Sequence, residues 1–130
     1  MKALSRINHI GLRVSDFDRS TAFYNKLGFE TIAGPAGPEP VAILEHASGI
    51  NINLILNANQ EETLNILMDV PTKHTGYTHV ALEVDDADVA LKELETLGIP
   101  LSAEPMEHPA GTSLFVRDPD KNVVEFYAPK

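Results

Sequence analysis

The chain has 130 residues, about the length of one domain, and carries 10 Lys and Arg against 19 Asp and Glu, a formal net charge of −9. This acidic balance argues against nucleic acid or an anionic membrane as a partner, because both require a basic surface. Cysteine is absent, which excludes disulfides, thiolate metal sites and a cysteine nucleophile. We therefore expect a soluble, cytoplasmic single domain without a targeting or membrane-spanning segment.

The sequence contains an internal repeat. Residues 7–16 (INHIGLRVSD) align with residues 77–86 (YTHVALEVDD), so that His9 matches His79 at an offset of 70 positions. Farther along the chain the offset becomes 72, which aligns Asn53 with Glu125. Such a repeat indicates one structural module used twice. We place the modules at about 1–57 and 76–130, with a connection at about 58–75.

Both halves predict the same order of elements: a strand, a helix and three more strands. Alternating apolar residues mark the strands. The helices are expected to be capped by side-chain oxygens of Ser15-Asp16 and Asp85-Asp86 and ended by Gly28 and Gly98. The expected elements of the first half are a strand at 10–14, a helix at about 17–27 and strands at about 31–33, 41–45 and 51–56. Those of the second half are a strand at 80–84, a helix at about 87–97 and strands at about 101–103, 113–116 and 123–127. The expected fold class is α+β, with two tandem βαβββ modules forming a curved mixed sheet.

Polar side chains occupy the strand faces that point away from the helices. Neighbouring strand residues point to opposite sides of a sheet. The apolar residues next to each polar strand residue should therefore face the helix. If the two modules pair into one sheet, four polar side chains converge on its concave face: His9, Asn53, His79 and Glu125. Two histidines and a glutamate form a metal-ligand set with positions open for substrate or water. Taken singly, each side chain also fits a hydrogen-bonded or solvent-exposed strand residue.

Other polar residues have two interpretations each. Arg13 is either a solvent-facing strand residue or an anchor for an anion. The histidines at 46, 74 and 108 fall in turns or connections, where exposure to solvent is the usual state. His108 belongs to a segment, 107–112, that could form a mobile loop over the mouth of a cavity. The aspartates at 16, 18, 85, 86 and 88 are expected to be helix caps and partners of the helix dipole rather than catalytic residues.

Four stretches of the chain resemble the vicinal oxygen chelate superfamily, also called glyoxalase/bleomycin-resistance/extradiol-dioxygenase proteins. They are NHIGLRVSD at 8–16, FYNKLGF at 23–29, HVALEVD at 79–85 and DPDKNVVE at 118–125, and the likeness extends over nearly the whole chain. Members fold as paired βαβββ modules around a metal-binding cup and commonly form homodimers. The resemblance implies that His9, His79 and Glu125 hold a divalent metal ion, with nickel, manganese, zinc and iron(II) as candidates, and that Glu125 is the catalytic base.

The resemblance leaves several activities open for a small-molecule substrate. Arg13 and Asn57 match residues with which lactoylglutathione lyases hold glutathione, but Asn53 stands where those enzymes have a fourth ligand, a glutamate. Methylmalonyl-CoA epimerases tolerate an amide at that position. Tyr77 and Ser113 fall on positions used by fosfomycin-resistance thiol transferases, and extradiol dioxygenases use the same His/His/Glu set with iron(II).

We expect a glyoxalase-like lyase or isomerase that stabilises an enediolate or oxyanion on a small substrate such as a glutathione adduct. The alternatives are a dioxygenase or thiol transferase, and a non-catalytic ligand-sequestering protein of the bleomycin-resistance type. The side chains expected to contact the substrate are Arg13, Asn53, Asn57, Tyr77 and Ser113.

Overall fold

The computed structural model describes residues 1–59 and 64–130. The chain divides into two compact units, Met1–Glu62 and Thr63–Lys130, and each unit is described by itself below. The boundary falls inside the connection that the sequence predicts at about 58–75.

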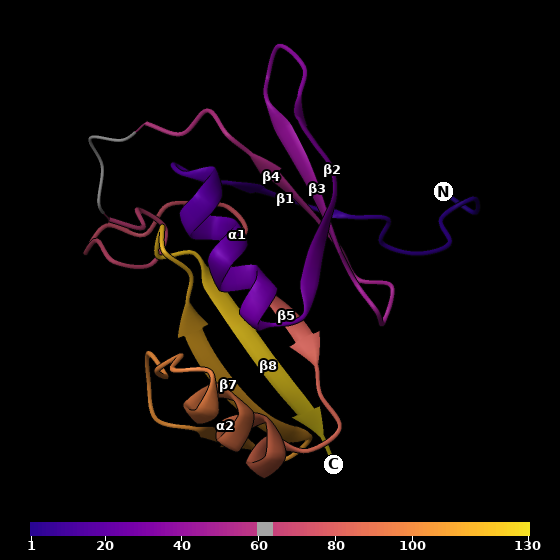
Figure 1. Cartoon of the computed structure of the whole chain (residues 1–130). Coiled ribbons are helices and arrows are strands. Elements are labelled where there is room, and N and C mark those ends of the chain that lie inside the picture. Colours follow the sequence, from indigo (N-terminus) through magenta and orange to yellow (C-terminus); the bar gives the residue numbers. More distant parts are fainter. Residues whose placement is uncertain (60–63) are drawn as a thin grey trace. The chain divides into compact units, whose positions relative to one another are not determined.

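The first unit is a four-stranded mixed sheet with one helix (Figure 1). The strands lie in the order β1-β4-β3-β2, with β1 parallel to β4 and the other neighbours antiparallel. Its elements are β1 (Ile10–Arg13), α1 (Phe17–Lys26), β2 (Phe29–Ala36), β3 (Val41–His46) and β4 (Asn51–Ile55).

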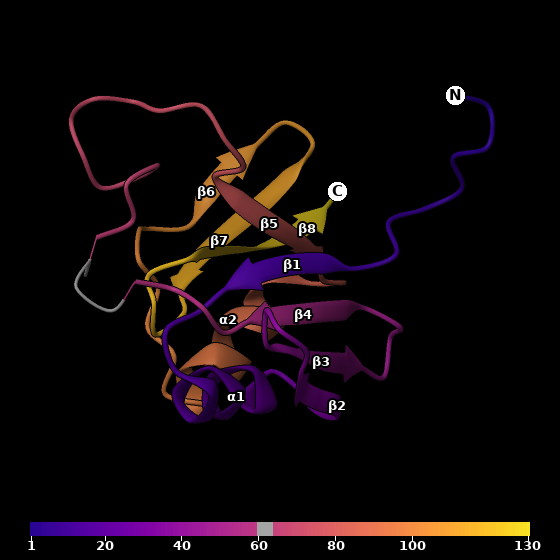
Figure 2. The same cartoon turned by 90° about the horizontal axis from the view of Figure 1, so that it is seen from above.

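The second unit repeats this arrangement with the strand order β5-β8-β7-β6 (Figure 2). Strands β5 and β8 are parallel, and the remaining pairs are antiparallel. Its elements are β5 (His79–Glu83), α2 (Ala87–Thr96), β6 (Met106–His108), β7 (Gly111–Arg117) and β8 (Val123–Pro129). The predicted fold class, two tandem βαβββ modules, is therefore confirmed.

The strand registers reproduce the alignment of the two halves. Gly11 on β1 pairs with Asn53 on β4, and Ala81 on β5 pairs with Glu125 on β8. Position 81 is 70 residues after position 11, and position 125 is 72 residues after position 53. The same pairing between first and last strand is therefore present in both units. Asn53 and Glu125 occupy equivalent places, each in the middle of a strand that has a neighbour on both sides.

The predicted helix boundaries are confirmed at both helices. Asp16 and Asp86 are the N-caps, and the side chain of each accepts a hydrogen bond from the backbone N–H three residues later. Gly28 and Gly98 follow the C-caps with φ of 89° and 68°, a region that favours glycine because it has no Cβ.

Each unit has its own apolar core between the helix and one face of the sheet. The buried helix residues are Ser20, Thr21 and Tyr24 in α1 and Ala90 and Leu94 in α2. Phe17, which begins α1, and Leu27, its C-cap, are half-buried. The buried strand residues of the first unit include Ala42, Leu44, Ile52 and Leu54, and those of the second include Leu82, Leu114, Val116, Val124 and Phe126.

Two strands differ from the prediction. Strand β2 runs over Phe29–Ala36, because its antiparallel pairing with β3 continues through two register shifts. The strand predicted at 101–103 is wrong: Leu101 forms only an isolated bridge with Val116, and β6 lies at Met106–His108. Strand β6 forms a tight hairpin with β7, in which His108 pairs with Gly111. His108 therefore lies in a strand and not in a mobile loop.

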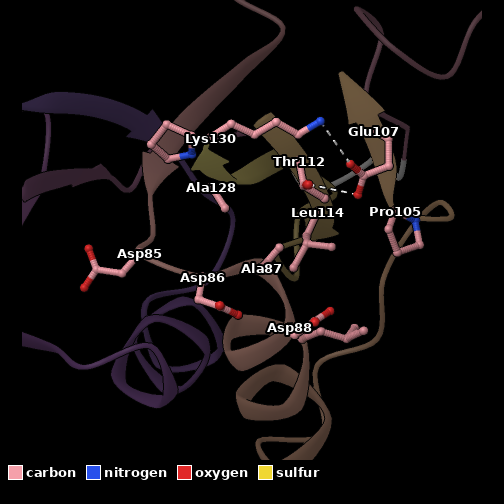
Figure 3. Close-up of a pocket in the computed structure, with 12 residues that line it drawn as sticks. Asp85, Asp86, Ala87, Asp88, Pro105, Glu107, Thr112, Leu114, Ala128 and Lys130 are labelled. Carbon is pink, nitrogen blue, oxygen red and sulfur yellow. Dashed lines mark hydrogen bonds and ion pairs between the residues drawn. The ribbon is translucent and has the colours of Figure 1, made fainter. Parts of the chain in front are cut away.

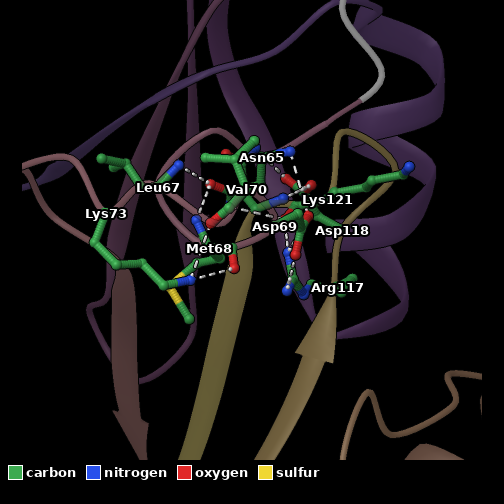
Figure 4. A network of polar contacts seen from close by, with 10 residues as sticks. Asn65, Leu67, Met68, Asp69, Val70, Lys73, Arg117, Asp118 and Lys121 are labelled. Atoms are coloured by element: carbon green, nitrogen blue, oxygen red, sulfur yellow. Dashed lines mark hydrogen bonds and ion pairs between the residues drawn. The ribbon is translucent and has the colours of Figure 1, made fainter.

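The segment before β5 is attached to the second sheet by a polar network (Figure 4). Arg117 donates to both carboxylate oxygens of Asp69 over 2.9 and 3.2 Å, and also to the carbonyl oxygen of Lys121. The side-chain amide of Asn65 donates to the same carbonyl. The Arg117 guanidinium holds the pKa of Asp69 below its ordinary value.

In the part of the chain that the structure describes, α1 and α2 have ten residues each. No helix there is long and apolar enough to span a bilayer.

Candidate metal centre

A histidine and a carboxylate meet on the face of the second sheet that points away from α2. Glu125 lies in the middle of β8 and His79 begins the neighbouring strand β5. The Nε2 atom of His79 is 3.0 Å from Oε2 of Glu125. The ring of Phe115 packs edge-on against His79, with the ring centroids 6.0 Å apart. Glu125 is only 8% exposed, so its carboxylate depends on nearby polar groups to replace lost water.

The other carboxylate oxygen of Glu125 is held by Ser113. The hydroxyl of Ser113, on β7, donates to Oε1 of Glu125 over 2.5 Å. Ser113 is 1% exposed. The Nε2 atom of His108 lies 3.1 Å from the same hydroxyl oxygen. Residues from β5, β6, β7 and β8 therefore form one continuous polar chain, His79–Glu125–Ser113–His108.

Both predicted ligand histidines have their Nδ1 atom occupied by the preceding residue. In the first unit, Nδ1 of His9 is 2.8 Å from the side-chain oxygen of Asn8. In the second, Nδ1 of His79 is 2.9 Å from the hydroxyl oxygen of Thr78. An amide oxygen can only accept, so Nδ1 of His9 carries the proton, and in the neutral ring Nε2 keeps a free lone pair. His9 therefore shows the pattern of a metal-bound histidine, in which one nitrogen donates its proton to an oxygen and the other is available to the ion.

Asn53 presents a buried hydrogen-bond acceptor in the first unit, on the strand next to the one that His9 leads into. It pairs with Gly11 across β4 and β1, and residues 9 and 11 share one face of the chain as it enters β1. In the part of the chain that the structure describes, the buried Oδ1 atom of Asn53 has no hydrogen-bond partner. A buried oxygen without a partner is costly, and ligand binding is one reason for it to persist.

Arg13 and Asn57 also lie together, around the carboxylate of Glu39, which no sequence pattern marks as a site residue. Arg13 donates through Nε to the side-chain oxygen of Asn57 over 2.8 Å and through Nη2 to Glu39 over 3.1 Å. The side-chain amide of Asn57 donates to the same oxygen of Glu39 over 2.9 Å. Glu39 lies in the Gly- and Pro-rich segment between β2 and β3, whose composition indicates only a turn.

We expect Glu39 to titrate below its ordinary pKa of 4.5, because the hydrogen bond from Asn57 and then that from Arg13 lower it. Its contribution to stability is therefore present at neutral pH and is lost only as the pH falls through this lowered pKa. Carboxyl ¹³C NMR of the wild type and Asn57→Ala measures the shift. The midpoint of Glu39 should rise toward 4.5 in the variant, while that of Asp69, which is lowered by Arg117, stays fixed. An unchanged Glu39 midpoint would contradict the assignment.

The remaining predicted residues are separated from these groups or lie in different units. Tyr77 is 99% exposed, just before β5. His74 is exposed, whereas His46 ends β3 beside the ring of Phe29. Over residues 1–59 and 64–130, no three His, Asp or Glu side chains form a metal-binding group. The structure thus brings together His79, Ser113 and Glu125, and separately Arg13 and Asn57.

A pocket lies on the helix side of the second sheet, away from Glu125 (Figure 3). It has a volume of about 300 Å³ and is bordered by the start of α2 and by β6, β7 and β8. Its charged lining residues are Asp85, Asp86, Asp88, Glu107 and Lys130. Thr112 donates to Glu107 there over 2.9 Å. None of the predicted site residues lines this pocket.

Tandem βαβββ modules, each with a parallel first and last strand, are the architecture expected of vicinal oxygen chelate proteins. The chain belongs to the Glyoxalase/Bleomycin resistance protein/Dioxygenase superfamily, whose family model matches residues 6–126.

Its relatives include proteins with and without an assigned activity. It is 32% identical to the uncharacterized protein YwkD of Bacillus subtilis, over 95% of this chain and 97% of that protein. It is also 32% identical to a lactoylglutathione lyase of Haemophilus influenzae, over 93% of this chain and 90% of that enzyme. Among solved structures, SMU.1112c superimposes with a TM-score of 0.76 at 28% identity, covering 95% of this chain and 98% of that one.

Proposed function

We propose that the protein is a divalent-metal-dependent, glyoxalase-like lyase or isomerase in which His9, His79 and Glu125 hold the metal ion. The observation that carries the proposal is the repeated environment of the two histidines. Each has Nδ1 against the side-chain oxygen of the preceding residue, Asn8 or Thr78, which fixes the direction of Nε2, and Nε2 of His79 faces Glu125. The relatives named lactoylglutathione lyase support the same class of activity.

The donor chemistry fits such an ion. Imidazole nitrogens and carboxylate or amide oxygens suit nickel, manganese, zinc and iron(II). The Nε2 atom of His79 and Oε2 of Glu125 lie 3.0 Å apart, so these two groups would both be available to hold one ion. Asn53, with its unpartnered buried oxygen, would stand next to the ion.

A bound divalent ion would supply Lewis-acid stabilisation of an oxyanion on the substrate. The carboxylate of Glu125 would accept a proton from the carbon beside the substrate carbonyl, as general base. Arg13 and Asn57 would bind an anionic end of the substrate, in the place where they now bind Glu39. Tyr77 and Ser113 stay predicted substrate contacts.

The proposal is tested by metal stoichiometry and by turnover. The metal-free protein is offered nickel, manganese, zinc or anaerobic iron(II), and we expect one ion per chain with at least one of them. The loaded protein is then assayed with the hemithioacetal substrate of lactoylglutathione lyases. His79→Ala should remove both signals, whereas the matched control, His74→Ala, should keep them. Less than stoichiometric binding of all four metals would refute the metal site.

A ligand-sequestering protein is the second candidate. The observation that favours it is that His79 and Ser113 already satisfy both oxygens of Glu125, so the carboxylate is stable without a further group. Calorimetry with bleomycin-type ligands distinguishes the two functions. Tight binding that His79→Ala leaves unchanged would favour sequestration, whereas binding that needs the metal would favour the enzyme.

We also propose that the chain forms a homodimer, because the family it belongs to commonly builds its sites from modules of two chains. Light scattering coupled to size-exclusion chromatography should give twice the mass of the 130-residue chain. A monomer mass at working concentrations would contradict this proposal.

A further inference from the structure

We propose that Ser113 and His108 are positioning residues that orient the carboxylate of Glu125 for metal binding. The inference rests on the proposed function, since it concerns how one of the proposed ligands is held. It rests on a chain of hydrogen bonds within the second unit alone, which runs from half-buried His108 through buried Ser113 to buried Glu125.

The direction of these hydrogen bonds follows from the number of protons available. An ionised carboxylate only accepts, so the single hydroxyl proton of Ser113 points to Oε1 of Glu125. The hydroxyl oxygen must then accept from Nε2 of His108, 3.1 Å away. His108 is thereby assigned as the Nε2–H tautomer. One nitrogen proton on β6 thus fixes the rotation of a hydroxyl on β7, which in turn fixes a carboxylate on β8.

Burial of Ser113 restricts the orientation of its hydroxyl. Ser113 is 1% exposed, so its hydroxyl has little water to exchange with and keeps its orientation. With Oε1 held by Ser113, Glu125 can turn only Oε2 toward His79. The carboxylate is therefore prepared to bind an ion through one defined oxygen. Such supporting contacts around a ligand typically raise metal affinity by about 10–100-fold.

Strand β7 provides a matched control at the next residue. Thr112 donates its hydroxyl to Glu107 over 2.9 Å, on the opposite face of the sheet. Thr112→Ala and Ser113→Ala therefore each remove one hydroxyl-to-carboxylate hydrogen bond from adjacent positions of one strand. Only Ser113→Ala removes a hydrogen bond to Glu125.

Nickel titration of the metal-free protein by calorimetry is the first measurement. We expect Ser113→Ala and His108→Leu to weaken nickel binding about 10–100-fold. His108→Gln, which can keep an N–H donor near Ser113, should restore most of the affinity. Thr112→Ala should bind nickel as the wild type does. Because His108 is only half-buried, its two variants remain informative if Ser113→Ala fails to fold.

Histidine-selective ¹⁵N NMR of the metal-free protein is the second measurement, and it needs no metal or activity. We expect His108 as the Nε2–H tautomer in the wild type and in Thr112→Ala, with that preference lost in Ser113→Ala. An Nδ1–H tautomer in the wild type would overturn the inference, and so would unchanged nickel affinity in both Ser113→Ala and His108→Leu. If the wild type binds no nickel, manganese, zinc or iron(II), the metal site fails, and a positioning role for Ser113 and His108 fails with it. The NMR result then decides only the direction of the hydrogen bonds.

Discussion

Glu125→Gln should weaken binding of a divalent ion by at least about 100-fold. Loss of a residue that only orients a ligand costs up to about this much, and Glu125→Gln removes a charged proposed ligand itself. The amide has nearly the same volume, so β8 should keep its place in the sheet. The neutral side chain also loses one acceptor, because its NH₂ group only donates. Calorimetric titration of the metal-free variant with nickel or manganese gives the dissociation constant directly.

Glu107→Gln is the matched control for this experiment. Glu107 also accepts a hydroxyl hydrogen bond from β7, but it lies on the helix side of the sheet. Its variant should bind the ion with wild-type affinity. Equal weakening in both variants would indicate a general effect of negative charge, and unchanged affinity in Glu125→Gln would remove Glu125 from the proposed ligand set.

Leu44→Ala should lower the free energy of unfolding by about 2–5 kcal/mol, the usual cost of truncating a buried leucine. Leu44 is 0% exposed and lies in β3, between β4 and β2, so a cavity there has strands on both sides. Urea denaturation followed by circular dichroism gives the free energy of unfolding.

Ile32→Ala supplies the comparison, because Ile32 is 55% exposed on β2. Its free energy of unfolding should differ from that of the wild type by no more than about 0.5 kcal/mol. A loss below about 1 kcal/mol in Leu44→Ala would mean that the first core is less tightly packed than its burial indicates.

The repeat made most of the fold predictable. His9 and His79 mark the start of the repeated strand, and the two offsets correctly anticipate the pairing of Asn53 and Glu125 with equivalent partners. The N-caps were predictable to within the pairs Ser15-Asp16 and Asp85-Asp86, because N-capping depends on local sequence. These features all rest on short-range patterns that appear twice.

The failures occur where no clear turn or periodicity marks which residues pair. The short apolar stretch around Leu101 looks like a strand, but β7 pairs instead with Met106–His108. That pairing turns His108 from a loop residue into a strand residue beside Ser113. The position of Glu39 between Arg13 and Asn57 was equally hidden, because no periodicity specifies where a turn carboxylate comes to rest.

The equivalent positions of Asn53 and Glu125 have a consequence for how this protein can change. If Glu125 holds the metal ion as proposed, a single module would need one side chain to serve both as that ligand and as the neighbouring group. Two copies separate these demands, because one strand carries the acid at position 125 and its equivalent carries a neutral amide at position 53. On that proposal, substitutions at position 53 can change the surroundings of the ion while Glu125 stays in place.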